Sequence, residues 1–95
     1  MKAEKIEWIL DWIRENNSPV DILNSKFVDD YVNHFNPTVE ILPFGANRCP
    51  DLGRVLSWGY KNGYLNRGRI SLSCKEVGFP NWVYVYNVNQ PPNGA

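Results

Sequence analysis

The sequence predicts a small α+β domain in which three helices are followed by a C-terminal β-hairpin. Apolar residues recur at helical spacing in three segments before residue 62, and two strand-like stretches follow that point. The chain has 95 residues, of which 43% are hydrophobic and 14% aromatic, and this suits one modest core. We therefore expect one domain over residues 1–88 and a disordered tail over residues 89–95.

The first two helices are predicted from their apolar stripes and from the residues that bound them. Residues 3–16 carry one stripe at helical spacing, and the Asn-Asn-Ser-Pro run that follows stops the helix. A second helix is expected to begin at Asn24 or Ser25, either of which can cap it, and to end near Phe35. Residues 20–22, between the two helices, are expected to form a small strand.

The third helix follows an irregular connection. Residues 37–50 contain three prolines and a glycine, so we expect either an irregular loop or a helical turn there. Pro50 is a good first-turn residue, and the helix is expected to run to about Lys61, where Asn62-Gly63 predicts a left-handed end. The predicted core face consists of Leu52, Val55, Leu56 and Gly59.

The last part of the chain reads as a hairpin with a long polar tip. Residues 65–72 and 82–88 are the two strands, and the second has the highest β propensity in the chain. Arg67 and Arg69 are two residues apart on the first strand, so they are expected to point the same way.

The order of these elements resembles the winged helix-turn-helix family. The similarity is most specific over residues 50–88, where a leucine-rich helix leads through Asn62-Gly63 and the pair Tyr64-Leu65 into a basic strand. The run Gly-Phe-Pro-Asn-Trp-Val-Tyr-Val-Tyr over residues 78–86 is similar to the return strand of such wings. The resemblance implies a small transcriptional regulator that binds duplex DNA, with the third helix in the major groove and the hairpin as the wing.

The distribution of charge separates two halves of a chain whose net charge is zero. Residues 1–44 hold four basic and eight acidic side chains, whereas residues 45–95 hold six basic and two acidic ones. The acidic half opposes attraction to DNA over long distances, so we expect weak, salt-sensitive binding by a monomer. Binding by a symmetric dimer to a palindromic site is expected to be tighter.

Candidate DNA contacts lie on the third helix, just before it and on the hairpin. Arginine binds guanine through two hydrogen bonds, lysine reaches guanine or phosphate, and serine donates or accepts. Two guanidiniums on one strand suit the DNA backbone or the minor groove. The predicted contacts are Asn47, Arg48, Arg54, Ser57, Lys61, Arg67, Arg69 and Lys75.

Trp8 and Trp12 lie one helical turn apart beside acidic residues, and two interpretations stay open for them. Either the first helix is buried on two sides, for example against the C-terminal strand, or the two indoles mark a dimer or partner interface. The second interpretation favours a different function on the same fold. It is a protein-interaction module with an acidic and aromatic face, of the kind that phages encode to inhibit a host protein.

Other functions lack the residues that they need. Cys49 and Cys74 with the single His34 do not make a zinc site, and we expect two free thiols. No nucleophile-base set or phosphate-cradling glycine loop is present, so we predict no enzymatic activity, no metal and no cofactor. Without a signal peptide or a membrane-spanning run, the protein is expected to be cytoplasmic.

Overall fold

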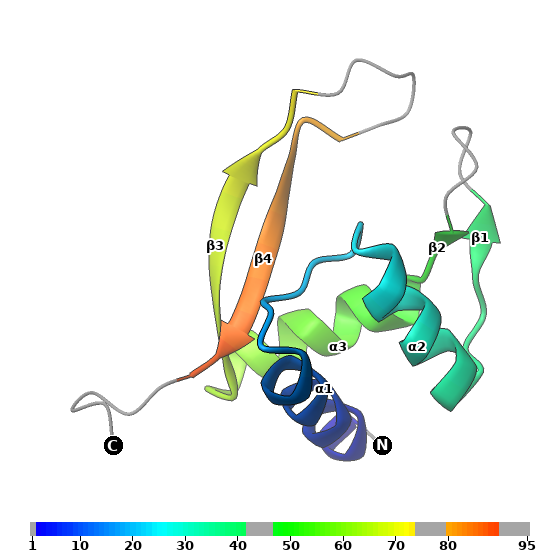
Figure 1. Cartoon of the computed structure of the whole chain (residues 1–95), viewed down its shortest axis with the longest axis vertical. Helices are drawn as coiled ribbons and strands as arrows, with labels where there is room; N and C mark the ends of the chain where they lie inside the picture. Colours follow the sequence, from blue (N-terminus) through cyan, green and yellow to red (C-terminus); the bar gives the residue numbers. More distant parts are fainter. Residues whose placement is uncertain (1, 42–46, 74–79, 90–95) are drawn as a thin grey trace.

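The computed structural model describes residues 2–41, 47–73 and 80–89, and it shows the expected α+β class (Figure 1). The helices are α1 (Lys2–Asn16), α2 (Ser25–Phe35) and α3 (Pro50–Lys61), and their predicted positions are confirmed. The antiparallel strands β3 (Leu65–Ser71) and β4 (Trp82–Val88) form the C-terminal hairpin. No helix among these residues is long and apolar enough to span a membrane.

The ends of α1 and α2 are set by asparagines. Asn17 adopts a left-handed conformation with φ of 48°, and the Ser18 amide then donates to the Ile13 carbonyl at 3.2 Å. At the start of α2 the Asn24 side chain accepts a hydrogen bond from the Phe27 amide at 3.1 Å. Asn36, with φ of 51°, ends α2.

Helix α3 ends where the Asn-Gly pair predicts. Gly63 has φ of 83°, which only glycine adopts without strain, whereas Asn62 keeps a negative φ. The Tyr64 amide donates to the Gly59 carbonyl at 2.9 Å, and the Gly63 amide donates to the Tyr60 carbonyl at 3.2 Å. These two bonds form a Schellman motif, which turns the chain directly into β3.

The connection between α2 and α3 differs from both expectations. Its described residues include a strand pair, in which β1 (Glu40–Ile41) pairs antiparallel with β2 (Asn47–Arg48). The expected strand at residues 20–22 is also reduced, to a single bridge between Val20 and Tyr86. Their amides and carbonyls exchange hydrogen bonds of 2.9 and 2.7 Å, which add one residue of a third strand beside β4.

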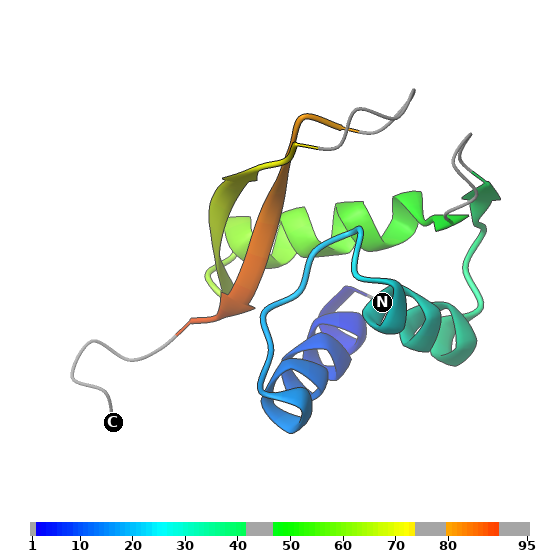
Figure 2. The same ribbon diagram turned by 45° about the horizontal axis from the view of Figure 1, so that its top comes forward.

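The core lies among the three helices and the base of the hairpin. Figure 2 shows α3 running from the β1–β2 pair at one end to the β3–β4 hairpin at the other. The predicted core face of α3 is confirmed, because Leu52, Val55, Leu56 and Gly59 are all buried. Leu65 and Val88, which are paired at the base of the hairpin, are buried with them, so the hairpin is anchored at its base.

A polar junction ties the three helices together at Asp51 in the first turn of α3. Its Oδ2 accepts hydrogen bonds from Lys5 Nζ of α1 at 2.9 Å and from the Tyr31 hydroxyl of α2 at 2.6 Å. Burial opposes ionisation of Asp51, but these two hydrogen bonds and the charges of Lys5 and Arg54 outweigh it and lower the pKa of the carboxyl. Burial and the bond to Asp51 both raise the pKa of Tyr31.

Candidate nucleic-acid interface

The outer face of α3 carries the residues that the sequence predicts for it. Arg54 and Lys61 are exposed, and Ser57 is half-buried between them. They share this face because positions three, four and seven apart fall on one side of a helix, opposite the buried core face. Within the described part of the chain, neither cation lies within 4.0 Å of an acidic oxygen.

Arg67 joins the hairpin to α3 through aromatic rings. Its guanidinium carbon lies 4.0 Å from the ring centroid of Tyr60, at the C-terminal end of α3. The same carbon lies 4.0 Å from the ring centroid of Tyr84 on β4. A guanidinium over an aromatic ring is attracted by the negative face of that ring. These contacts hold β3 against the end of α3.

Arg69 lies further along β3 and has one aromatic neighbour in the described residues. Its guanidinium carbon is 4.4 Å from the Trp82 ring centroid, and the Trp82 ring meets Tyr84 edge-on at 4.8 Å. The register Arg69↔Tyr84 puts these side chains on the same face of the hairpin as Arg67. The predicted common direction of Arg67 and Arg69 is therefore confirmed.

We treat the cation-bearing sides of α3 and of the hairpin together and call them the basic surface. It covers the outer face of α3 and the arginine side of the hairpin, and the Tyr60–Arg67 contact connects the two parts. Arg67 and Arg69, like the cations of α3, have no acidic partner among the described residues. The basic surface consists of Arg54, Ser57, Lys61, Arg67 and Arg69.

The remaining predicted contacts are not part of this patch as described. Arg48 lies before α3, at the end away from the hairpin, and pairs with Glu40 across the β1–β2 strands at 3.2 Å. That pair is exposed and therefore weak. Asn47 belongs to β2. Lys75 lies outside the described residues.

Three aromatic residues of this region were missed by the sequence argument: Tyr60, Tyr84 and Trp82. Trp82 and Tyr84 are two residues apart on β4, and Tyr60 lies on the flank of α3. Aromatic residues at such positions usually indicate core packing. Alternation along residues 82–86 is visible in the sequence, but its register against β3 is not. Only the pairing of the strands places Trp82 and Tyr84 beside arginines, and only the packing of the hairpin against α3 places Tyr60 there.

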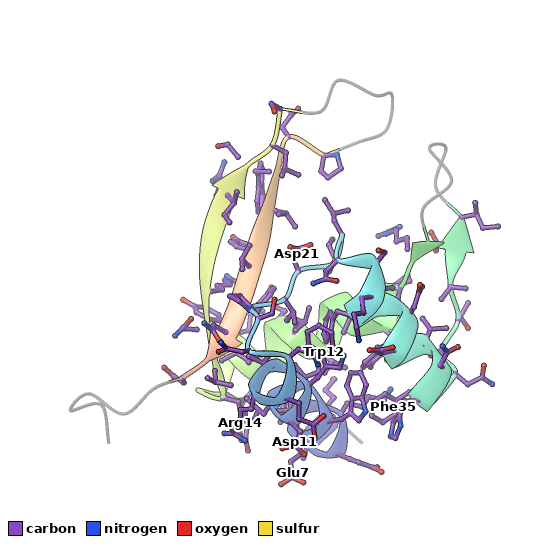
Figure 3. All side chains as sticks on the ribbon, viewed as in Figure 1. Glu7, Asp11, Trp12, Arg14, Asp21 and Phe35 are labelled. Carbon is purple, nitrogen blue, oxygen red and sulfur yellow. The ribbon has the colours of Figure 1, made fainter. Side chains whose placement is uncertain are left out.

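Acidic side chains of α1 point away from the rest of the molecule. Figure 3 shows Glu7 and Asp11 pointing away from the other helices, whereas Trp12 points between α1 and α2. Glu4 and Glu15 are exposed on the same helix.

Trp12 belongs to the core. It is 7% exposed, and its Nε1 donates a hydrogen bond to Asp30 Oδ2 on α2 at 2.8 Å. This bond, together with one from Lys26, lowers the pKa of Asp30. Of the two interpretations, burial of the first helix on two sides matches the structure, because α2 covers Trp12 and α1 also packs against β4, the C-terminal strand.

Trp8 is half-buried and stays accessible at one edge. Its ring stacks on the ring of the exposed His34, with 5.5 Å between the centroids. The two rings line a shallow hollow of about 400 Å³ over α1 and α2. The other lining residues are Trp12, Glu15, Asp30 and Asn33.

Comparison with known proteins adds no relative. The chain matches no model of a protein family, no curated protein and no solved structure. No cluster of three potential metal ligands occurs in the ranges that the structure describes. Cys49 is buried and free, as expected, and Cys74 lies outside those ranges.

Proposed function

We propose that this protein binds double-stranded DNA as a winged helix-turn-helix domain. In this proposal α3 is the recognition helix and the β3–β4 hairpin is the wing. The domain would act as a small transcriptional regulator. The order of helices and hairpin supports the assignment of the fold, and the basic surface supports the assignment of the ligand.

One observation carries the proposal: the exposed cations of α3 and the arginines of the hairpin belong to two elements that the Tyr60–Arg67 contact joins. Cations that serve only to keep a protein soluble are usually interspersed with acidic side chains. Among the described residues, none of the four cations of this surface lies within 4.0 Å of an acidic oxygen, and Asp51 is the acidic side chain that attracts Arg54. A patch of one sign over a helix and an adjacent strand is the electrostatic footprint expected of a nucleic-acid interface.

The dimensions of α3 suit the major groove. An α-helix with its side chains is about 10–12 Å across, and the major groove of B-DNA is about 12 Å wide. Arg54 and Lys61 are seven residues apart, which corresponds to about 10 Å along the helix, or roughly three base pairs. Ser57 lies between them. We propose that these three side chains reach base edges while Arg67 and Arg69 contact phosphates.

The total affinity of one domain is expected to be modest, because the acidic surfaces of α1 and α2 repel the DNA. A homodimer on a palindromic site would double the number of contacts. Arg48 can leave its weak pair with Glu40 and join the interface, since that pair is exposed.

The test is fluorescence anisotropy with random duplex DNA at about 50 and 200 mM salt, where phosphate contacts differ most in strength. Wild-type protein should bind at the lower salt, and Arg67→Glu/Arg69→Glu should abolish binding. The matched control is Lys2→Glu/Arg14→Glu, which makes the same change in net charge on α1 and should retain most of the affinity. Absence of wild-type binding at low salt would refute the proposal.

A protein-interaction module is the second candidate, and the hollow beside Trp8 favours it. The accessible edge of Trp8, the stacked His34 and the nearby Glu15 would suit a basic side chain of a host protein. In a pull-down, Trp8→Ala should lose a partner that the wild type retains, while thermal unfolding shows that the variant is still folded. Equal retention by both proteins would exclude this hollow as the interface.

A further inference from the structure

The side chain of Arg67 has an unusual number of aromatic neighbours for an arginine on a strand. Rings from two different elements, Tyr60 of α3 and Tyr84 of β4, each lie 4.0 Å from its guanidinium carbon. Tyr60 is 40% exposed, so its ring is not required to fill the core. The position of this ring beside Arg67 calls for an explanation other than packing.

Stacking decides which part of the guanidinium is available to a ligand. Two rings lie against the Arg67 guanidinium, and the side chain also hydrogen-bonds Tyr86, which raises the pKa of Arg67. A guanidinium has five N–H donors, so an N–H edge remains for a ligand. That edge has the forked geometry that donates two parallel hydrogen bonds to one phosphate. The rings also restrict the long side chain before any ligand binds, so less conformational entropy is lost on binding.

We propose that Tyr60 and Tyr84 are positioning residues that hold Arg67 edge-on as a subsite for one phosphate of the DNA backbone. The inference rests on the proposed DNA-binding function and deepens it. Tyr60 precedes Lys61 and lies one turn beyond Ser57, so the subsite lies where α3 meets the hairpin. A phosphate bound there would fix the register of α3 in the groove.

Arg69 provides the contrast within the same strand. It has a single ring, Trp82, at 4.4 Å among its described contacts, and it is exposed where Arg67 is half-buried. Its guanidinium therefore keeps more freedom and fits a contact that adjusts to the DNA. The two arginines carry the same charge, so charge would not explain a difference in mobility between their guanidiniums.

A double-mutant cycle between Tyr60 and Arg67 tests the inference with duplex DNA as the probe. Tyr60→Leu should weaken binding roughly 3- to 10-fold in the wild-type background, because an immobilised side chain contributes that much when it is ordered in advance. In the Arg67→Gln background the same change should have no further effect, since the group that Tyr60 positions is absent. Arg67→Lys should also weaken binding, although it keeps the charge.

Two controls separate positioning from a general loss of structure. Tyr60→Phe keeps the ring and should bind as the wild type does. Tyr64→Leu removes another exposed tyrosine, which stacks on Trp58 rather than on an arginine, and should leave affinity unchanged. Thermal unfolding of each variant shows whether it is folded at the temperature of the binding measurement.

A second readout does not involve DNA. Relaxation of the arginine Nε–H groups by NMR should show Arg67 restricted in the free protein and mobile in Tyr60→Leu, with Arg54 mobile in both. A mobile Arg67 in the wild type, or equal losses from Tyr60→Leu in both arginine backgrounds, would overturn the inference alone. A wild-type protein that does not bind duplex DNA would overturn the proposed function and the inference with it.

Discussion

Gly59 shows how one missing side chain determines the packing of two helices. A Cβ at this position would overlap Ile6 Cδ1 of α1 and would lie 3.0 Å from Leu65 Cδ1 of β3. Both neighbours are fully or almost fully buried, so neither can move aside freely. Gly53, on the same helix, has no atom within 4 Å of the corresponding Cβ position.

We therefore predict opposite effects for the same substitution at these two positions. Gly59→Ala should lower the free energy of unfolding by about 1–3 kcal/mol, which is the usual cost of overpacking a core. Gly53→Ala should raise it by up to about 1 kcal/mol, because alanine favours helix more than glycine does. Urea unfolding measures both, and equal effects would contradict the close packing at Gly59.

The junction at Asp51 makes a prediction about pH. The pKa of Asp51 is lower in the folded protein than its ordinary value of 3.8. A carboxyl with a lowered folded pKa contributes stability that is present above its unfolded pKa, near 4, and that is lost as the pH falls through the folded pKa.

Asp51→Asn should therefore flatten the acid limb of the stability curve below about pH 4. At neutral pH it should cost about 1–3 kcal/mol, since Lys5 and Tyr31 lose their charged acceptor. Urea unfolding between pH 2 and pH 7 measures this, with Asp29→Asn on the exposed side of α2 as the control. An unchanged acid limb would mean that Asp51 is not coupled to folding.

At the scale of the element, α2 depends on its first turn. The Asn24 side chain accepts a hydrogen bond from the Phe27 amide. The Phe27 ring is fully buried and packs against the ring of Trp12. A defect at the cap would thus loosen an aromatic cluster as well as a helix end.

Asn24→Ala should lower the free energy of unfolding by about 1 kcal/mol, the typical contribution of such a cap. Asn33→Ala is the matched control, because Asn33 is exposed on the same helix and α2 keeps its cap. Chemical denaturation followed by tryptophan fluorescence would report on the cluster directly. A loss of the same size in both variants would argue against the capping role.

In the hairpin, strand pairing places alternate aromatic residues of β4 on the same face as the arginines of β3. Residues 82, 84 and 86 alternate along β4, and the register with β3 places them opposite Ser71, Arg69 and Arg67. A shift of one residue would turn the arginines to the other face, where Val83 and Val85 lie. The buried pair Leu65↔Val88 at the base prevents that shift.

At the scale of the whole molecule, the separation of charge predicts how binding responds to salt. If the four cations of the basic surface each neutralise a phosphate, the logarithm of the association constant should fall with that of salt with a slope of about −3.6. Affinity would then drop about a hundredfold between 50 and 200 mM salt. Replacing one of the four by glutamine should reduce the slope by about 0.9, and a slope near zero would contradict phosphate binding by this surface.

Sequence patterns predicted the helices well because each one has its own local signal. Apolar spacing located α1, α2 and α3, and the asparagines and Gly63 located their ends. Residues 37–50 could not be predicted in the same way, because a pair of two-residue strands has too few positions to show a period. Trp12 remained open because its burial depends on α2, which is distant in the sequence.

The sequence by itself determined the α+β class, the core face of α3, the Asn-Gly exit from that helix and the common direction of Arg67 and Arg69. These follow from interactions within a few residues, which are the same wherever the segment is placed. Only the tertiary structure decided that Tyr60 and Tyr84 flank Arg67, that Asp51 joins three helices and that Trp12 is buried against α2. Each of those contacts joins segments from different elements, and their approach depends on packing that local spacing does not encode.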